Sequence, residues 1–105
     1  MPNTIPVSVL LCVYKNDNAI FLSQSIDSVL LQTNKPNEIV IVVDGPIGKS
    51  LKKLLSDYED HSKIIKILYL PKNIGVGSAS NEGLKLCQND LIAKMDADDI
   101  SLPNR

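Results

Sequence analysis

The chain has 105 residues, of which 44% are hydrophobic and 22% charged, and its net charge is −1 at pH 7. A chain of this length can bury one modest core, so we expect one domain. The near-neutral charge offers no basic surface for nucleic acid, and no nucleic-acid partner is expected. Short apolar runs, the lack of signal-peptide features and the absence of a paired-cysteine pattern predict a cytoplasmic protein, which could work at the inner face of the membrane.

The first half of the chain predicts a strand, a helix and a second strand. Residues 7–14 form a nearly unbroken apolar run, which is typical of a strand buried on both faces. A helix is expected at about residues 19–32, with Asn16 or Asp17 as its cap and apolar side chains along one face. After a turn cluster, the apolar residues 38–43 predict a second buried strand.

The second half repeats this alternation. Its spacing predicts, in chain order, a helix with Leu51, Leu54, Leu55 and Tyr58 on one face, a strand at 64–70, a helix with Ala79, Gly83, Leu86 and Cys87 on one face, and a buried strand at 91–95. The resulting order βαβαβαβ favours an α/β fold, a Rossmann-like parallel sheet with right-handed crossovers and helices on both faces.

Three carboxylates, Asp96, Asp98 and Asp99, follow the last predicted strand. If the backbone stays extended, Asp96 and Asp98 point to the same side, roughly 7 Å apart at Cα. Two carboxylates whose oxygens approach to about 4 Å repel by roughly 4 kcal/mol at an effective dielectric near 20. A bound cation removes that repulsion, and oxygen ligands suit Mg²⁺ or Mn²⁺. The alternative is a solvated turn after a strand.

Two further side chains are expected at the same edge, because the carboxyl ends of parallel strands lie together and form the usual ligand site of such sheets. Asp44 ends the second strand and could accept a hydrogen bond from a nucleobase N–H or a hydroxyl, or could simply form a turn in Asp-Gly-Pro. Tyr14 ends the first strand and could stack on a base, or be an ordinary half-buried tyrosine.

The small residues 75–80 open the third predicted helix but do not form a dinucleotide fingerprint, because Ser80 replaces the third glycine and the motif follows the third strand. Small residues at a helix N-terminus still let backbone N–H groups approach an anion. Asn73 and Asn81 could add side-chain hydrogen bonds. The alternative is a flexible loop before an ordinary helix.

Taken together, these segments resemble the N-terminal half of the family 2 glycosyltransferases, enzymes with the GT-A fold. The matching pieces occur in order: the opening strand 7–14, an "SI.S.L.QT" helix at 25–33, a strand with its Asp at 38–45, "N.G...A.N.GL" at 73–84 and "DADD" at 96–99. The resemblance implies strand order 3-2-1-4. It also implies that residues 1–105 form the half that binds a nucleotide-diphosphate sugar and stop before the acceptor-binding half.

The family resemblance implies an inverting, metal-dependent transfer of a sugar from a nucleotide-diphosphate donor, expected to be a UDP-sugar, to a sugar or lipid-linked acceptor in polysaccharide, lipopolysaccharide or capsule synthesis. The implied donor-binding residues are Tyr14, Asp44, Asn73, Gly75, Asn81 and Asp96, and the implied ligands of Mn²⁺ or Mg²⁺ are Asp98 and Asp96. No catalytic residue is assigned, because the catalytic base is expected beyond Arg105. The chain by itself is therefore expected to bind donor without turnover.

Two expectations complete the sequence-based interpretation. The alternative function is a non-catalytic α/β module for nucleotide binding or assembly. In strand order 3-2-1-4, residues 91–95 form an apolar edge of this chain. Such an edge is a template for pairing, so we expect self-association through that strand.

Overall fold

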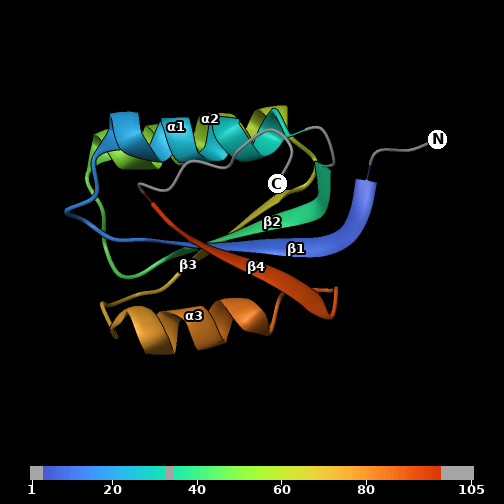
Figure 1. Cartoon of the computed structure of the whole chain (residues 1–105). Coiled ribbons are helices and arrows are strands. Elements are labelled where there is room, and N and C mark those ends of the chain that lie inside the picture. Colours follow the sequence, from blue (N-terminus) through green and yellow to red (C-terminus); the bar gives the residue numbers. More distant parts are fainter. Residues whose placement is uncertain (1–3, 33–34, 98–105) are drawn as a thin grey trace.

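The computed structural model describes residues 4–32 and 35–97, in which strands and helices alternate (Figure 1). The elements are β1 (Thr4–Val13), α1 (Ala19–Leu30), β2 (Lys35–Val43), α2 (Lys49–His61), β3 (Ile65–Tyr69), α3 (Val76–Leu84) and β4 (Leu91–Asp96). All neighbouring strands are parallel and their order is β3-β2-β1-β4, which confirms the predicted α/β fold and strand order. None of the helices in these ranges has the length and apolar character needed to cross a bilayer.

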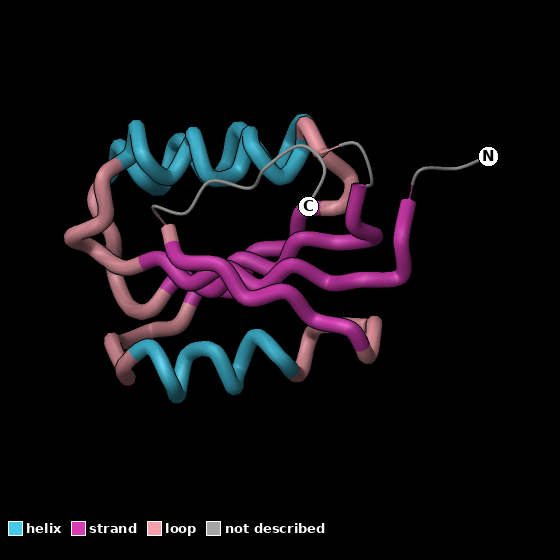
Figure 2. The backbone as a smooth tube through the Cα atoms, in the orientation of Figure 1, coloured by secondary structure: helices cyan, strands magenta, loops and turns pink. Residues whose placement is uncertain are grey.

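The helices cover both faces of the sheet (Figure 2), with α1 and α2 on one side and α3 on the other. The core has two layers because successive strand residues point to opposite faces. One layer joins the strands to α1 and α2 and includes Val9, Leu11, Ile39, Ile41, Leu22, Ile26, Leu51 and Leu55. The other joins them to α3 and includes Leu10, Val40, Val42 and Ala79. This double coverage explains why residues 7–13 of β1 and 39–43 of β2 are apolar at nearly every position.

Helix α3 lies close to the sheet because small residues face it. A Cβ added at Gly83 would lie 2.4 Å from Cγ2 of Val42 and 2.5 Å from Cδ1 of Leu10, so a larger residue would push the helix away. Ala79, one turn earlier, is fully buried. The predicted face is therefore confirmed at these two positions. It is wrong at Leu86, which is 41% exposed because the helix ends two residues before it.

Strand β4 is the outer strand next to β1 in the described part of the sheet. It was expected to be buried, and this is wrong for most of its length: Met95 is 5% exposed, whereas Leu91 is 63% exposed and Lys94 is also exposed. The reason is that β1 is its one strand partner among residues 4–32 and 35–97. Self-association through this strand stays a prediction.

We expect the exposed edge of β4 to pair weakly with a second copy of the chain. Lys94 on the strand opposes such pairing, as charged residues do on natural sheet edges. Leu91→Lys should weaken self-association by about tenfold or more, because burying a leucine contributes about 1.5–3 kcal/mol. Light scattering across a concentration series measures this. A wild-type chain that stays monomeric at the highest concentration would contradict the prediction.

A buried polar network joins the strands toward their amino ends. Glu38, only 3% exposed, accepts hydrogen bonds from the hydroxyl of Ser8 and the backbone N–H of Gln88, and its Oε1 lies 2.8 Å from Nζ of Lys66. The side chain of Asn89 donates to the Ser8 hydroxyl at 3.1 Å. Burial would raise the pKa of Glu38, but these donors outweigh it, so its pKa lies below its usual value of 4.5.

This network makes the free energy of unfolding depend on pH. Because the folded-state pKa of Glu38 is lowered, the stability from its ionised form is present above pH 4.5 and is lost as the pH falls through the folded-state pKa. Glu38→Gln should lower the free energy of unfolding at pH 7 by about 1–2 kcal/mol, since solvent partly screens Lys66. Urea titrations of both proteins should show this difference shrinking as the pH falls below 4.5. A difference that stays constant down to pH 3 would show that the charge of Glu38 is not its cause.

Candidate functional site

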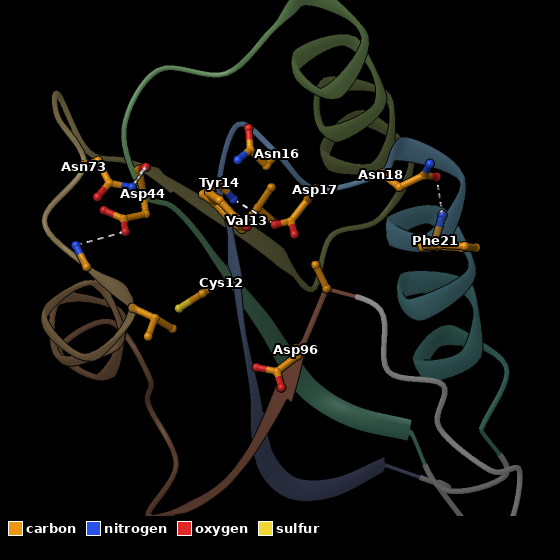
Figure 3. Close-up of a pocket in the computed structure, with 13 residues that line it drawn as sticks. Cys12, Val13, Tyr14, Asn16, Asp17, Asn18, Phe21, Asp44, Asn73 and Asp96 are labelled. Atoms are coloured by element: carbon orange, nitrogen blue, oxygen red, sulfur yellow. Dashed lines mark hydrogen bonds between the residues drawn. The ribbon is translucent and has the colours of Figure 1, made fainter.

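A cleft of about 700 Å³ opens at the carboxyl edge of the sheet, where β1, β2 and β4 end (Figure 3). Five of the predicted site residues line it together: Tyr14, Asp44, Asn73, Gly75 and Asp96. They come from four separate segments of the chain, which the parallel sheet brings to one edge.

Two other predicted site residues are not part of the described cleft. Asn81 is exposed on α3 and is not among the residues that line the cleft, so the structure does not bring it to the other five. It lies a turn and a half beyond Gly75, too far along the helix to share the loop at its start. Asp98 lies outside the described residues.

Asp44 fixes the loop between β3 and α3. The carboxylate is 5% exposed; its Oδ1 accepts the backbone N–H of Ile74 at 2.8 Å and its Oδ2 accepts that of Gly75 at 3.1 Å. In return, the side-chain amide of Asn73 donates to the backbone oxygen of Asp44 at 3.2 Å. Both carboxylate oxygens are thus already engaged, and a ligand N–H would share an oxygen with the loop. A direct contact of Asp44 with a ligand stays a prediction.

The glycine after Asp44 is required by the same loop. Gly45 has φ +92°, a backbone conformation that residues with a Cβ rarely adopt. A Cβ at this position would also lie 2.6 Å from the backbone nitrogen of Asn73. The loop then enters α3 through Gly75, which has φ +94° and makes no side-chain capping hydrogen bond. The first backbone N–H groups of α3 therefore lie beside the cleft, and no side chain among the described residues caps them.

The β1–α1 loop and the start of α1 contribute residues that the sequence-based site omitted: Asn16, Asp17 and Asn18 from the loop and Phe21 from the helix all line the cleft. Asp17 holds the backbone of Tyr14 through two hydrogen bonds. Its Oδ2 accepts from the Tyr14 N–H at 2.9 Å, and its own N–H donates to the backbone oxygen of Tyr14 at 3.1 Å. The cap of α1 is Asn18, not Asn16 or Asp17 as expected, because its Oδ1 accepts the first free N–H groups of the helix. The position of this loop directly after the first strand was a signal that could have revealed it.

Two aromatic side chains give the cleft flat apolar surfaces. Tyr14 is 42% exposed and Phe21 is 53% exposed, although large aromatic side chains of this kind usually pack in a core. Figure 3 shows Phe21 on the α1 side of the cleft and Asp44 with Asn73 on the opposite side. Exposed aromatic rings in a cleft suit a planar base or the apolar face of a sugar ring.

The side chains that line the cleft carry negative charge. Asp17, Asp44 and Asp96 all line it, and none of its described lining residues is Lys, Arg or His. Lys15 lines a smaller neighbouring cavity of about 440 Å³, which shares Tyr14, Asp44 and Asn73 with the cleft. Within residues 4–32 and 35–97, no three His, Cys, Asp or Glu side chains gather closely enough to hold a metal. The cleft therefore favours a cation and disfavours an anion that enters alone.

A parallel sheet with a polar cleft at its carboxyl edge defines the class of open α/β proteins that bind ligands beyond their strand ends. Within that class, residues 8–105 match the model of the family described as glycosyl transferase family 2. The chain belongs to glycosyl transferase family 2, which confirms the family that the sequence motifs indicated.

Two similar proteins are bacterial glycosyltransferases. The amylovoran biosynthesis glycosyltransferase AmsE of Erwinia amylovora is 40% identical over 93% of this chain and 36% of its own length. The UDP-Gal:alpha-D-GlcNAc-diphosphoundecaprenol beta-1,3-galactosyltransferase of Escherichia coli is 36% identical over 98% of this chain and 37% of its own length. The chain thus spans little more than a third of these relatives.

Solved structures share the fold at lower identity. TarS of S. aureus has a TM-score of 0.79 and 21% identity over 95% of this chain and 18% of its own. The mannosyltransferase PcManGT of Pyrobaculum calidifontis, in complex with GDP-Man and Mn²⁺, has a TM-score of 0.77 and 17% identity over 89% of this chain and 27% of its own. These likenesses support the GT-A type of α/β fold.

Proposed function

We propose that this chain forms the donor-binding part of a glycosyltransferase that transfers a sugar from a nucleotide-diphosphate sugar to an acceptor. The observation that carries the proposal is that Tyr14, Asp44, Asn73, Gly75 and Asp96 line one cleft. Family membership supports sugar transfer as the reaction. A UDP-sugar is the proposed donor, because the Escherichia coli relative is named for UDP-Gal and is more similar to this chain than the structure that holds GDP-Man.

The proposed acceptor is a sugar or a lipid-linked sugar in the synthesis of cell-surface polysaccharide. The names of the relatives support this, since one acts in amylovoran biosynthesis and another on a diphosphoundecaprenol-linked sugar. Inversion at the sugar carbon and a cytoplasmic location remain part of the proposal. The catalytic base is proposed to lie outside residues 1–105, so this chain alone should bind donor without transferring its sugar.

A divalent cation, Mn²⁺ or Mg²⁺, is proposed to bind at Asp96 and Asp98. Asp96 fits this role because it offers carboxylate oxygens at the exposed end of β4, within a cleft whose described lining lacks a cationic side chain. The described residues supply this one donor of the proposed pair. When bound, such an ion neutralises the charge that develops on a departing diphosphate. PcManGT, which shares the fold, is solved with Mn²⁺.

The remaining cleft residues are proposed to orient the donor. Tyr14, whose backbone is held by Asp17, presents its ring to the base, and Phe21 presents an apolar face on the α1 side of the cleft. Gly75 and Val76 bring the uncapped start of α3 to the cleft, where backbone N–H groups can donate to phosphate oxygens. Each role uses a group that already faces the cleft.

Thermal unfolding with added nucleotide tests the donor-binding proposal. UDP with Mn²⁺ should stabilise the chain by about 2.7 kcal/mol at a hundredfold excess over the dissociation constant. GDP in the same assay decides the preferred base. A non-catalytic assembly module would show no stabilisation by UDP, GDP or their sugars with either Mn²⁺ or Mg²⁺, and that result would reject the proposed function.

A further inference from the structure

One buried hydrogen bond links helix α1 to the end of β4. The hydroxyl of Ser25, which is fully buried in the middle of α1, donates to the backbone oxygen of Ala97 at 2.7 Å across 72 positions of sequence. Ala97 itself is 7% exposed. Ser25 does not line the cleft, so its hydroxyl acts on the cleft only through the backbone it holds.

This hydrogen bond lies just past the end of β4, next to the cleft residue Asp96. The pairing of β4 with β1 ends where Asp96 lies opposite Cys12, so Ala97 is the first residue past the ladder. Its carbonyl would otherwise lack the strand partner that fixes the residues before it. Ser25 supplies that partner. The bond therefore holds the backbone at Ala97, the residue between Asp96 and Asp98 in sequence.

Helix geometry supports the same arrangement. Phe21 lies four positions before Ser25, so both side chains are on one face of α1. Phe21 lines the cleft together with Ala97. The hydroxyl of Ser25 therefore joins the cleft wall formed by α1 to the wall formed by the end of β4.

We propose that Ser25 is a positioning residue, whose hydroxyl fixes the backbone at Ala97 and thereby holds Asp96 in place for a cation. The proposal rests on the proposed function, in which Asp96 binds Mn²⁺ or Mg²⁺. A purely structural role would affect stability alone. A positioning role also weakens metal binding, as the loss of partners that orient metal ligands commonly does, by about 10- to 100-fold.

The test compares Ser25→Ala with Ser8→Ala. Ser8 is also a fully buried serine with a hydrogen-bonded hydroxyl, but it belongs to the Glu38 network toward the other end of the sheet. Calorimetric titration with Mn²⁺ in the presence of UDP should show about tenfold weaker binding for Ser25→Ala. Ser8→Ala should bind Mn²⁺ like the wild type, even if its melting temperature falls further. Equal Mn²⁺ affinity in Ser25→Ala and the wild type would overturn the proposal, as would equal losses in both variants.

Amide hydrogen exchange separates this proposal from the proposed function. Without any ligand, the backbone amides of residues 95–97 should exchange faster in Ser25→Ala than in the wild type. The amides in the middle of β1 should exchange at the wild-type rate. If the wild type binds neither UDP nor GDP with Mn²⁺ or Mg²⁺, the proposed function fails, while unchanged exchange at residues 95–97 would refute the role of Ser25 by itself. Should Ser25→Ala not fold, Ser25→Cys keeps the shape of the side chain with a slightly larger and weaker donor, and should show the same changes at smaller amplitude.

Discussion

Chelation of divalent cations is expected to abolish the binding of UDP and UDP-sugars to this chain. The described lining of the cleft contains Asp17, Asp44 and Asp96 and no cationic side chain. At a separation of roughly 6 Å and an effective dielectric near 20, each pair of like charges repels by about 3 kcal/mol. A diphosphate entering alone would meet several such pairs. Its affinity should therefore fall by more than about a hundredfold without a cation to bridge the charges.

Asp96→Asn distinguishes a metal ligand from an acid that merely repels the donor. If Asp96 binds the cation, the variant should lose about tenfold or more of the Mn²⁺-dependent affinity for UDP. If it only repels, UDP should bind the variant more tightly than the wild type even when Mn²⁺ is present. Glu82→Gln is a suitable control, because Glu82 is an acid on α3 paired with Lys85 and does not line the cleft. Titration calorimetry with Mn²⁺, with Mg²⁺ and with EDTA measures all three proteins, and equal affinity of the wild type in all conditions would contradict the prediction.

The parallel sheet and the place of the cleft could be predicted because they depend on patterns that are local in sequence, whereas the strand order was implied by the family resemblance. The apolar runs that became β1 and β2 show burial on both faces, and parallel strands must bring Tyr14, Asp44 and Asp96 to one edge. The burial expected for β4 was wrong for most of its length, because burial of a strand depends on which chain segments cover its outer edge. A strand pattern alone does not carry that information.

The finer roles of the site residues could not be predicted because they depend on tertiary partners. The sequence predicted that Asp44 could accept a hydrogen bond from a ligand. In the structure its partners are backbone N–H groups about 30 positions away. Ser25 reads as one of several helical serines, and only the packing of α1 on β4 shows its bond to Ala97. Phe21 carries the pattern of an ordinary helix residue. Each of these assignments needs the distance between segments that are remote in sequence.

Asp44→Asn is expected to lower both the stability of the chain and its affinity for donor. The asparagine would keep one oxygen acceptor but would turn its NH₂ group toward the N–H of either Ile74 or Gly75, placing two donors face to face. Hydrogen bonds to a charged group contribute about 1.5–3 kcal/mol, and a buried N–H left without an acceptor adds to the loss. We expect a free energy of unfolding about 2–3 kcal/mol lower, measured by urea titration.

The control for this prediction is Asp57→Asn, which removes an exposed carboxylate that pairs with Lys53 on α2 at 3.4 Å. Such a surface pair contributes at most about 0.5 kcal/mol, so this variant should unfold almost like the wild type. Hydrogen exchange should locate the effect of Asp44→Asn at Ile74 and Gly75. The uncapped start of α3 depends on that loop for its position, so UDP affinity should fall together with loop protection. Full stability with reduced affinity would instead mean that Asp44 contacts the donor directly and that its bonds to the loop contribute little.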